Sequence, residues 1–414
     1  MTTPGRNWAE THAYEATTLH RPTTVDELRR VVAQASRVRA LGTRHSFHDL
    51  ADSPGVLVAL DAIPHEVVLD PEARTATVSA AARYGDVAPV LHEAGWALAA
   101  MASLPHISVA GAVATGTHGS GDRIPTLAGA VVALELVGAD GDLVTVREGD
   151  PDFAGMVVGL GALGVVTRVS LRVEPAYDVR QRVHNAVPWE TVVGELDAIT
   201  SAADSVSIFT RWGAEAVEQV WWKSRVQAEP SATWGVPATA DQHPILGIDP
   251  VHATPQGGVP GPWFERLPHF RMGFTPSVGA EIQAEYLLPR ASFPDAVAAL
   301  RALGPRIDPL LQVTEIRTMP ADDLWLSPAY GRDTVAIHFT LVRDPSAVRR
   351  LLPAVEEALA PYEARPHWGK WFTLDADALA ARYPRLPDFV ALADRLDPEG
   401  CFRNAFLERT VLRR

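Results

Sequence analysis

The sequence contains one cysteine, Cys401, among its 414 residues. A single thiol excludes an intramolecular disulfide framework and fits a reducing compartment. The N-terminus has no apolar core flanked by basic residues, and no later apolar run approaches the length of a membrane span. We therefore expect a cytoplasmic protein with no membrane partner, in which Cys401 is a buried thiol near the C-terminus.

Basic residues are also scarce, because 37 Lys and Arg stand against 50 Asp and Glu, for a formal net charge of -13. Nucleic acids and anionic lipids both require a basic surface, so neither is expected as a partner. His106 and His118 have no cluster of matching ligands around them, and neither H-E-x-x-H nor G-x-S-x-G occurs. Metal catalysis and a nucleophilic serine are therefore disfavoured, and a neutral small-molecule substrate fits best.

The length and composition indicate a globular protein of two domains, with 47% apolar and 21% charged residues. Short apolar or alternating runs mix with a few amphipathic helices, which is an α+β pattern. The expected N-terminal elements are a short strand over 7–19, a helix capped by Thr24 and Glu27, a helix over 84–93, and a hairpin of 131–137 with 143–146.

Two segments rich in small and hydroxyl-bearing residues dominate the first part of the chain, at 41–48 and 103–121. Each follows an apolar run, which is what a backbone needs if its N–H groups are to close around a diphosphate. Gly42 permits a tight turn, and Thr43 and Ser46 offer hydroxyls to phosphate oxygens. A loop histidine such as His45 is by itself more often a solvated side chain, but these neighbours favour a ligand role.

The run from Gly159 to Gly164 matches the dinucleotide fingerprint G-x-G-x-x-G. That motif works only when a strand precedes it and a helix begins at it. Here 153–158 is typical of a helix and 165–173 of a strand, so the order is reversed. We predict a turn pressed against a cofactor and not a Rossmann site.

The later part of the chain predicts a sheet with helices, with strands over 205–212, 217–226, 281–288, 311–318 and 334–342 and helices over 294–303 and 346–360. Residues alternate between the faces of a strand, so Glu315 shares a face with Arg317, and His338 shares one with Thr340. The opposite face of the last strand, with Val335, Ile337, Phe339 and Leu341, is expected to be core.

Two interpretations of the polar face remain. Glu315 and Arg317 either form a solvated pair with an incidental His338, or they roof a pocket that Lys370 completes. An ordered array of donors and acceptors suits a polyol, because each buried hydroxyl needs partners. Similarly, the segment 229–268, rich in proline and glycine, is either a lid that wraps the molecule or a surface excursion.

Several motifs resemble the vanillyl-alcohol-oxidase superfamily of flavoproteins. Leu41 to Phe47 resembles its histidine-bearing phosphate loop, and 103–121 resembles its other flavin-holding loop. Within the superfamily, 101–108, 261–271, 315–318, 325–334 and 365–370 resemble the alditol (xylitol) oxidase family. The aldonolactone oxidoreductases share the His-Trp-Gly-Lys element at 367–370, so the strands with Glu315 and His338 are the better discriminators.

The resemblance implies a two-domain α+β fold of the vanillyl-alcohol-oxidase (PCMH) type. Residues 1–174 would form the FAD-binding domain, and 175–374 a substrate-binding cap built on an antiparallel sheet flanked by helices. Residues 375–414 would return to the FAD domain. The protein is expected to be a monomer.

The resemblance also implies FAD as the cofactor, bonded covalently through His45. The other residues that would line the flavin are Leu41, Gly42, Thr43, Arg44, Ser46, Phe47, Ser103, Ser108, Gly111, Ala112, Val113, Ala114, Gly119 and Val166.

The implied reaction is oxidation of xylitol, sorbitol and similar alditols at the terminal primary hydroxyl. A hydride passes to flavin N5, and O2 then reoxidises the flavin to give H2O2 and an aldose. Contacts with the polyol are implied for Ser103, Glu315, Arg317, Thr340 and Lys370, with His338 beside them.

Arg317 and Lys370 are the residues expected to polarise the reacting hydroxyl. The proton acceptor is left open among His338, Lys370 and Glu315. Two other functions also stay open at this point: an aldonolactone oxidase or dehydrogenase on the same scaffold, and a non-catalytic sugar-binding protein.

Overall fold

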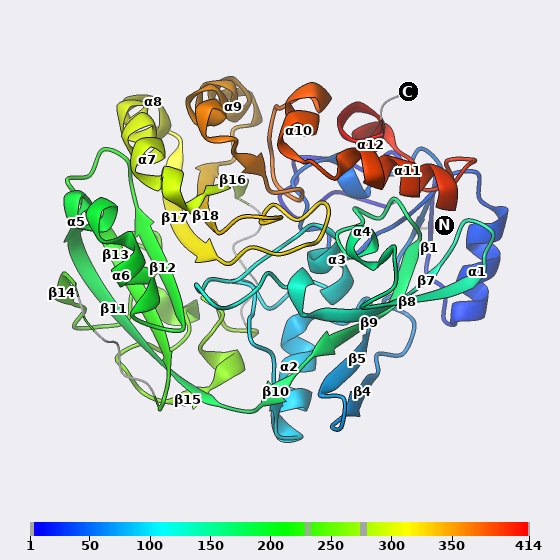
Figure 1. The fold of residues 1–414 in the computed structure, drawn as a ribbon, viewed down its shortest axis with the longest axis horizontal. Coiled ribbons are helices and arrows are strands. Elements are labelled where there is room, and N and C mark those ends of the chain that lie inside the picture. The colour runs from blue at the N-terminus through cyan, green and yellow to red at the C-terminus, as the bar shows by residue number, and fades with distance from the viewer. Residues whose placement is uncertain (1–3, 228–231, 233, 274–279, 413–414) are drawn as a thin grey trace.

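The computed structural model describes residues 4–227, 232, 234–273 and 280–412. Helices and mostly antiparallel sheets form two regions that lie side by side in Figure 1, which confirms the α+β class. Residues before about 175 build one region, and the longest sheet builds the other. Among the described residues, no helix combines the length and the apolarity needed to cross a bilayer.

The N-terminal region contains a parallel three-stranded sheet of order β1-β3-β2, an antiparallel five-stranded sheet of order β4-β5-β9-β7-β8, and the pair β6-β10. The strands are β1 (Thr18–His20), β2 (Val38–Ala40), β3 (Val56–Val58), β4 (Val67–Asp70), β5 (Thr75–Ser79), β6 (Trp96–Ala97), β7 (Val131–Val137), β8 (Leu143–Arg147), β9 (Val165–Arg172) and β10 (Glu174–Pro175). The helices are α1 (Val25–Gln34), α2 (Tyr84–Glu93), α3 (Val109–Ala114) and α4 (Phe153–Met156), with 3-10 turns η1 (Asp49–Ala51) and η2 (Ala128–Ala130).

Local signals placed most of these elements correctly. The side chain of Thr24 accepts a hydrogen bond from the backbone N–H of Glu27 and caps α1, and β7 and β8 form the expected hairpin. The expected strand over 7–19 is wrong for most of its length, because only its last residues belong to β1 and Ala13 forms no more than an isolated bridge with Arg6. The preceding residues turn back on themselves, with the Asn7 N–H donating to the His12 carbonyl and Glu10 in the left-handed region at φ 57°.

The glycines at 159–164 join α4 to β9, as the reversed order of helix and strand predicted. No helix begins at these glycines, so a Rossmann arrangement is excluded. Gly164 has a φ of 147°, a conformation that L side chains rarely adopt, and it lets the turn pass close to the carbonyl of Val137.

The second region is organised by a nine-stranded antiparallel sheet of order β14-β11-β13-β12-β17-β18-β16-β19, with β15 also pairing with β11. Its strands are β11 (Asp178–Pro188), β12 (Ser205–Thr210), β13 (Ala216–Arg225), β14 (Val236–Pro237), β15 (Gly261–Pro262), β16 (Glu281–Pro289), β17 (Leu311–Met319), β18 (Thr334–Val342) and β19 (Arg365–Pro366). Its helices are α5 (Trp189–Gly194), α6 (Leu196–Ser201), α7 (Phe293–Ala302), α8 (Gly304–Ile307) and α9 (Pro345–Leu359), with 3-10 turns η3 (Pro250–His252), η4 (Trp263–Glu265), η5 (Arg290–Ser292) and η6 (Ala360–Tyr362).

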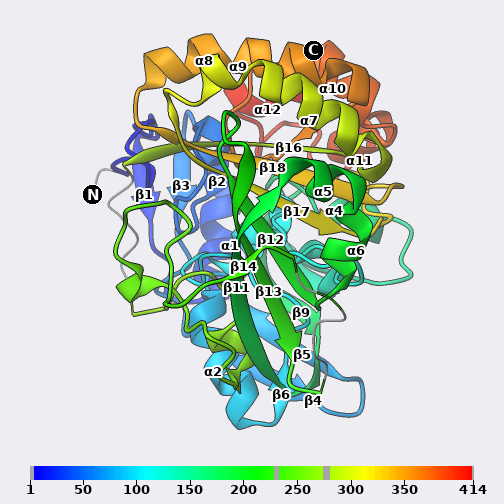
Figure 2. The same ribbon diagram turned by 90° about the vertical axis from the view of Figure 1, so that its left-hand side faces the viewer.

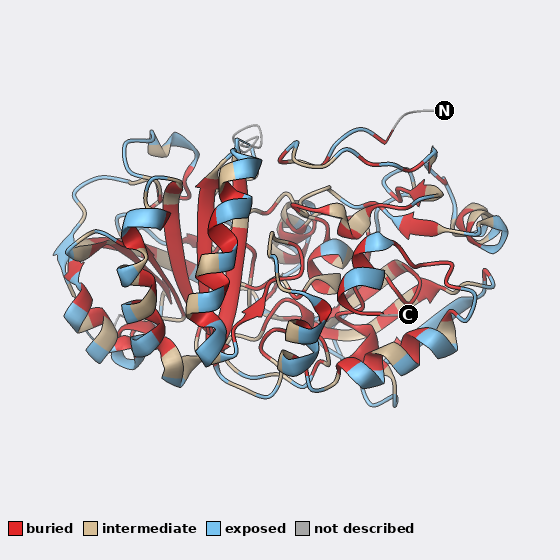
Figure 3. Cartoon of the chain, turned by 90° about the horizontal axis from the view of Figure 1, so that it is seen from above, coloured by how far each residue is buried: buried red, intermediate tan, exposed pale blue. Residues whose placement is uncertain are grey.

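Helices α5 to α9 cover one face of this sheet (Figure 2). The strands beneath them are buried, while the outer sides of the helices stay exposed (Figure 3). Val335, Ile337, Phe339 and Leu341 all lie in this core, as expected from the alternation along β18. The opposite face of the sheet is therefore the one that is left for polar side chains.

The C-terminal helices α10 (Ala376–Arg382), α11 (Leu386–Leu396) and α12 (Ala405–Thr410) return to the N-terminal region, where red lies beside blue in Figure 1. Asn404 donates to the carbonyls of Asp49, Leu50 and Asp52 at 3.1, 2.9 and 2.8 Å. Cys401 is buried, as expected. The exact domain boundaries at 174 and 374 stay predictions.

Arg39 ties three distant segments together from inside the molecule. Its guanidinium donates to the carbonyls of Leu50, Leu160, Gly161 and Phe402 at 2.6, 2.7, 2.7 and 3.0 Å. The side chain is buried, and all four of these acceptors are backbone carbonyls. The glycine turn and the C-terminal segment are thus fixed to strand β2, which carries Arg39.

We expect Gly164→Ala to destabilise the protein by about 1–3 kcal/mol, because a side chain is strained at this φ. The added Cβ would also lie 2.8 Å from the carbonyl oxygen of Val137. Gly194→Ala is the control, since its Cβ would meet nothing within 4 Å. Thermal unfolding of both variants tests this, and equal melting temperatures would contradict the strain at Gly164.

Candidate active site

A cavity of about 490 Å³ lies between the two glycine-rich segments and the polar face of the large sheet. The loop 41–47, the segment 102–118 and the glycine turn form one side, and strands β12, β16, β17 and β18 form the other. Lys370 and His367 close an edge. The predicted arrangement, in which the His45 loop faces the charged strands across a chamber, is present in the structure.

Most residues predicted to line the flavin or substrate do line this cavity. They are Leu41, Gly42, Thr43, Arg44, His45, Ser46, Phe47, Ser103, Ser108, Gly111, Ala112, Ala114, Val166, Glu315, Arg317, His338, Thr340 and Lys370. Val113 points the other way, because it lies on the inner side of α3 and packs in the core. Gly119 lines a smaller neighbouring pocket with Ser120.

The loop that carries His45 runs from β2 to η1, so both of its ends are fixed. Its ring stacks on Trp8 with 5.3 Å between centroids. Both ring nitrogens are buried and neither makes a hydrogen bond. Burial lowers the pKa of His45 to about 4, so the ring is neutral at pH 7. An imidazole with two unengaged nitrogens at a cavity wall fits a group that bonds to a ligand.

The two glycine-rich segments contact each other. The backbone N–H of Ser108 donates to Oγ1 of Thr43 at 3.2 Å, and a Cβ at Gly42 would lie 2.7 Å from the Ser108 Oγ. Arg44, with φ 64°, instead turns its guanidinium back to the carbonyl of Pro4. Small residues thus let the two segments approach each other closely at the wall of the cavity, as a diphosphate-binding loop requires.

Three strands place their charged residues in one row. Glu315 on β17 and Glu285 on β16 both lie opposite His338 on β18. Glu315 and Arg317 are each only 6% exposed, so the interpretation of a solvated pair is wrong. The polar face of the sheet is the roof of the cavity.

Glu285 is the centre of this network, and the sequence reasoning missed it. Its carboxylate lies 2.6 Å from Lys370 Nζ, 2.9 Å from Arg317 Nη2 and 3.3 Å from His118 Nε2. Burial alone would raise the pKa of Glu285, but the charge of Lys370, with His118 and Arg317, holds it well below its usual range. The alternation of Glu281, Gln283 and Glu285 along β16 was the available signal.

Lys370, His338 and Thr340 form a chain of hydrogen bonds. Lys370 Nζ lies 2.6 Å from His338 Nδ1, and His338 Nε2 lies 3.0 Å from Thr340 Oγ1. A hydrogen of Lys370 Nζ donates to Nδ1 of His338, so Nδ1 is the acceptor and the N–H of Nε2 donates to Thr340. Burial lowers the pKa of His338 to about 4 and also lowers that of Lys370.

Arg317 links this chain to the loop side of the cavity. Its Nη1 donates to the Ser103 Oγ at 3.4 Å and to the His118 carbonyl at 3.3 Å. Its Nε lies 3.5 Å from Glu315 Oε1. Burial opposes the charge, but Glu315 and Glu285 raise the pKa of Arg317, so it stays a cation.

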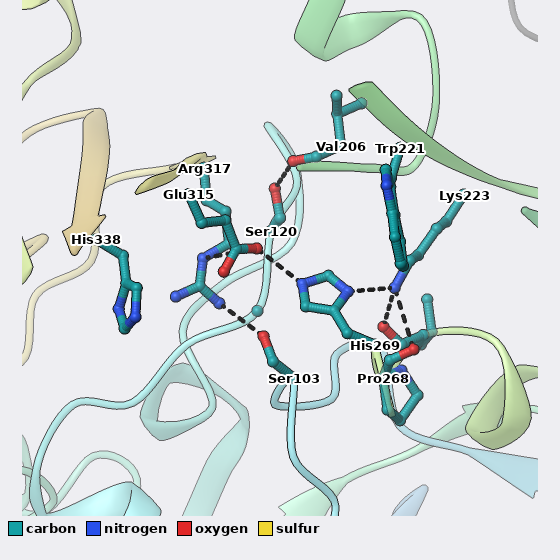
Figure 4. Close-up of polar contacts among 12 residues, drawn as sticks. Ser103, Ser120, Val206, Trp221, Lys223, Pro268, His269, Glu315, Arg317 and His338 are labelled. Carbon is teal, nitrogen blue, oxygen red and sulfur yellow. Dashed lines mark hydrogen bonds and ion pairs between the residues drawn. The ribbon is translucent and has the colours of Figure 1, made fainter. Parts of the chain in front are cut away.

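A second layer lies behind Glu315 (Figure 4). His269 Nε2 lies 2.8 Å from Glu315 Oε1, and Lys223 Nζ lies 3.0 Å from His269 Nδ1. Sequence reasoning missed both residues, because a single Lys on a buried strand and a His after an irregular loop carry no local signal. Only the pairing of β13, β12 and β17 brings them together.

The irregular segment before His269 covers the cavity. His243, Ile245, Ile248 and His252 line it, and the His269 N–H donates to the Ser103 carbonyl at 3.1 Å. This placement favours a wrapping segment over a surface excursion. Residues 229–231 and 233 of the predicted segment lie outside the described part.

Comparisons with known proteins match both regions. The profile of the FAD binding domain family matches residues 16–147, and that of the D-arabinono-1,4-lactone oxidase family matches residues 280–410. The chain is 49% identical over 411 residues to an alditol oxidase of Streptomyces sp., covering 98% of this chain and 99% of that protein. It is 30% identical over 426 residues to an L-gulono-1,4-lactone dehydrogenase of Mycobacterium tuberculosis, covering 98% of each.

The fold also matches solved structures. A crystal structure of cholesterol oxidase from B. sterolicum has a TM-score of 0.80 at 14% identity and covers 99% of this chain and 97% of that chain. At this identity the likeness shows the fold alone.

The fold, the matched FAD domain and the cavity define an FAD-dependent oxidoreductase with the two-domain architecture of the vanillyl-alcohol-oxidase superfamily. Within that class, the chain belongs to the alditol oxidase family. The resemblance drawn from the motifs is thereby confirmed, and a non-catalytic sugar-binding protein is excluded.

Proposed function

We propose that this protein oxidises alditols such as xylitol and sorbitol at a terminal primary hydroxyl, with O2 as the electron acceptor. The observation that carries this function is the roof of the cavity, where two carboxylates and two cations lie within one hydrogen-bonded network. The 49% identity to an alditol oxidase supports the same substrate class.

A neutral polyol fits this roof for electrostatic reasons. Arg317 lies between the carboxylates of Glu285 and Glu315, so its charge is already paired and an anionic substrate would find no free counter-charge. Glu315 offers an acceptor, Arg317 offers donors, the neutral amine of Lys370 offers a lone pair, and Thr340 offers a hydroxyl that both donates and accepts. Successive hydroxyl groups, each a donor and an acceptor, can be matched along such a surface.

FAD would lie along the glycine-rich loops, and the free nitrogens of His45 support a covalent bond from this ring to the flavin. When bound, the flavin would supply the redox chemistry, as the hydride acceptor for the alcohol carbon and the electron donor to O2, which becomes H2O2. The chain itself binds and orients the alditol, excludes water and accepts the hydroxyl proton.

Lys370 is the residue that we assign as the proton acceptor. A neutral amine has two hydrogens, which Glu285 Oε2 and His338 Nδ1 both accept at 2.6 Å, and its lone pair is then left for the substrate. Burial favours this neutral form because it lowers the pKa of Lys370. His338 has both nitrogens engaged, and the pKa of Glu315 is held too low for a base, despite burial, by Arg317 and His269.

Arg317 has a different task, because it keeps its charge throughout. Its guanidinium is held by Glu285, Ser103 and the His118 carbonyl. A fixed cation at this position stabilises the negative charge that develops on the alcohol oxygen as its proton leaves.

An aldonolactone is the alternative substrate, since the profile of a lactone oxidase family matches 280–410. It is less well supported, because the lactone dehydrogenase relative is 30% identical against 49% for the alditol oxidase. A monomeric state and a cytoplasmic location stay predictions.

Anaerobic addition of xylitol or sorbitol is expected to bleach the flavin absorption of the purified protein. Admission of air should then restore the colour with formation of H2O2. L-gulono-1,4-lactone serves as the competing reductant in a parallel experiment. Bleaching by the lactone alone would replace the proposed substrate class.

The bond to His45 is expected to keep the flavin on the chain after acid precipitation, with flavin fluorescence on a denaturing gel. His45→Ala should retain FAD only while folded, because the glycine loops still bind the diphosphate. His20→Ala, on an exposed residue, is the control. Yellow colour that washes off the precipitated wild-type protein would rule out the tether.

Arg317→Ala and Lys370→Met are expected to slow flavin reduction in distinguishable ways. Loss of the fixed cation should reduce the rate about 100-fold at every pH. In the wild type the rate should fall at low pH, as Lys370 becomes protonated, and Lys370→Met should lose this dependence. Stopped-flow measurements on variants that retain FAD test this, with Arg385→Ala as a surface control.

An Arg317→Ala variant that reduces at the wild-type rate would remove Arg317 from the reaction. A low-pH decline that persists in Lys370→Met would assign the proton to another group.

A further inference from the structure

Lys223 is a buried lysine to which the proposed reaction assigns no role. It lies on β13, is 1% exposed, and sits beside the Trp221 ring with Nζ 5.9 Å from the ring centroid. Its ammonium contacts the carbonyls of Leu267 and Pro268 at 2.5 and 3.2 Å and His269 Nδ1 at 3.0 Å. It makes no contact with a carboxylate of the described residues.

The number of hydrogens decides how His269 is protonated. A protonated lysine has three N–H donors, and Lys223 faces three acceptors, two carbonyls and one ring nitrogen. His269 Nδ1 must therefore be bare, which places the proton of the neutral ring on Nε2. That N–H points at Glu315 Oε1, 2.8 Å away (Figure 4).

The protonation of His269 determines how Glu315 is held. Its Oε1 accepts from His269 and lies 3.5 Å from Arg317 Nε, while Oε2 has no hydrogen-bond partner among the described residues. In the other tautomer of His269, a bare Nε2 would face the carboxylate and repel it. Lys223 thus holds Glu315 in place without touching it.

We propose that Lys223 is a positioning residue for the alditol: it fixes the Nε2–H tautomer of His269, which holds Glu315 Oε1 and leaves Oε2 to accept a substrate hydroxyl. This inference rests on the proposed function, because it assumes that the alditol lies against Glu315.

The surroundings of Lys223 make its proton easy to lose. Burial lowers the pKa of Lys223 to about 7, although Glu315 opposes the shift and Arg317 adds to it. The titratable and charged groups that face it are His269, Glu315 and Arg317. Above this pH the amine has only two hydrogens for three acceptors, so the hold on His269 Nδ1 weakens.

Two substitutions of His269 test its contact with Glu315 and its contact with Lys223 separately. The terminal amide of Gln reaches the place of Nε2, whereas that of Asn reaches only the place of Nδ1. We expect His269→Gln to keep a donor to Glu315 and to change the KM for xylitol by less than about threefold. His269→Asn should raise KM about tenfold or more with a much smaller change in kcat, since a hydrogen bond to a charged group is lost.

Lys223→Met is then measured in both backgrounds. With His269 present, it should raise KM about tenfold, because either tautomer becomes available. In the His269→Gln background it should change KM by less than about twofold, because an amide has no tautomer to set. Equal effects in the two backgrounds would mean that Lys223 only holds the Leu267 and Pro268 carbonyls, and would overturn the proposal.

The pH dependence gives a readout that a purely structural role would not move. The KM of the wild type should rise as the pH passes about 7, and this rise should be absent in His269→Gln. Lys370 titrates in both proteins and so cancels in the comparison. Should Lys223→Met fail to fold, equal KM values for His269→Gln and His269→Asn, with matching pH profiles, would still overturn the proposal.

The controls distinguish this inference from the proposed function. Flavin content and anaerobic bleaching by xylitol are recorded first on the wild type. A wild type that xylitol does not bleach would refute the substrate, whereas a bleached wild type with insensitive variants would refute only the role of Lys223.

Discussion

The ionised carboxylate of Glu285 is the interaction on which the site depends. It is 1% exposed and accepts from both Lys370 and Arg317, the two residues assigned to the substrate oxygen. A buried carboxylate is costly unless it is paired, and here several donors compensate it. Because Glu285 holds Lys370 and Arg317 on one side, the lone pair of Lys370 and the remaining hydrogens of Arg317 are directed into the cavity.

The sheet explains why these groups meet with such accuracy. Antiparallel register places Glu315, His338 and Glu285 side by side on three neighbouring strands, and helices on the far face hold the strands rigid. Arg317 and Glu315 therefore come from a hydrogen-bonded strand, whereas Lys370 lies in the segment after β19. The flavin side is different, because its loops are shaped by small residues that permit close approach.

Period-2 alternation was enough to predict the polar face and the core face of β18. The two glycine-rich loops were predicted from their small and hydroxyl-bearing residues, and the order of helix and strand was enough to reject a Rossmann site at Gly164. His269 and Lys223 were missed for a physical reason, since they reach Glu315 only through the pairing of β13, β12 and β17, whereas alternation along β16 did carry a signal for Glu285. The N-terminal strand was wrong because a left-handed turn at Glu10 and the Asn7 contacts override local β propensity.

The return of the C-terminus to Arg39 has a consequence for biosynthesis. The Arg39 guanidinium that holds the glycine turn also donates to the Phe402 carbonyl. Asn404 donates to the Leu50 carbonyl in the segment that follows His48. During translation the N-terminal region emerges first, yet its wall lacks this brace until Phe402 has been synthesised. The wall beside the glycine turn therefore reaches its final form only once the C-terminal segment has docked on β2.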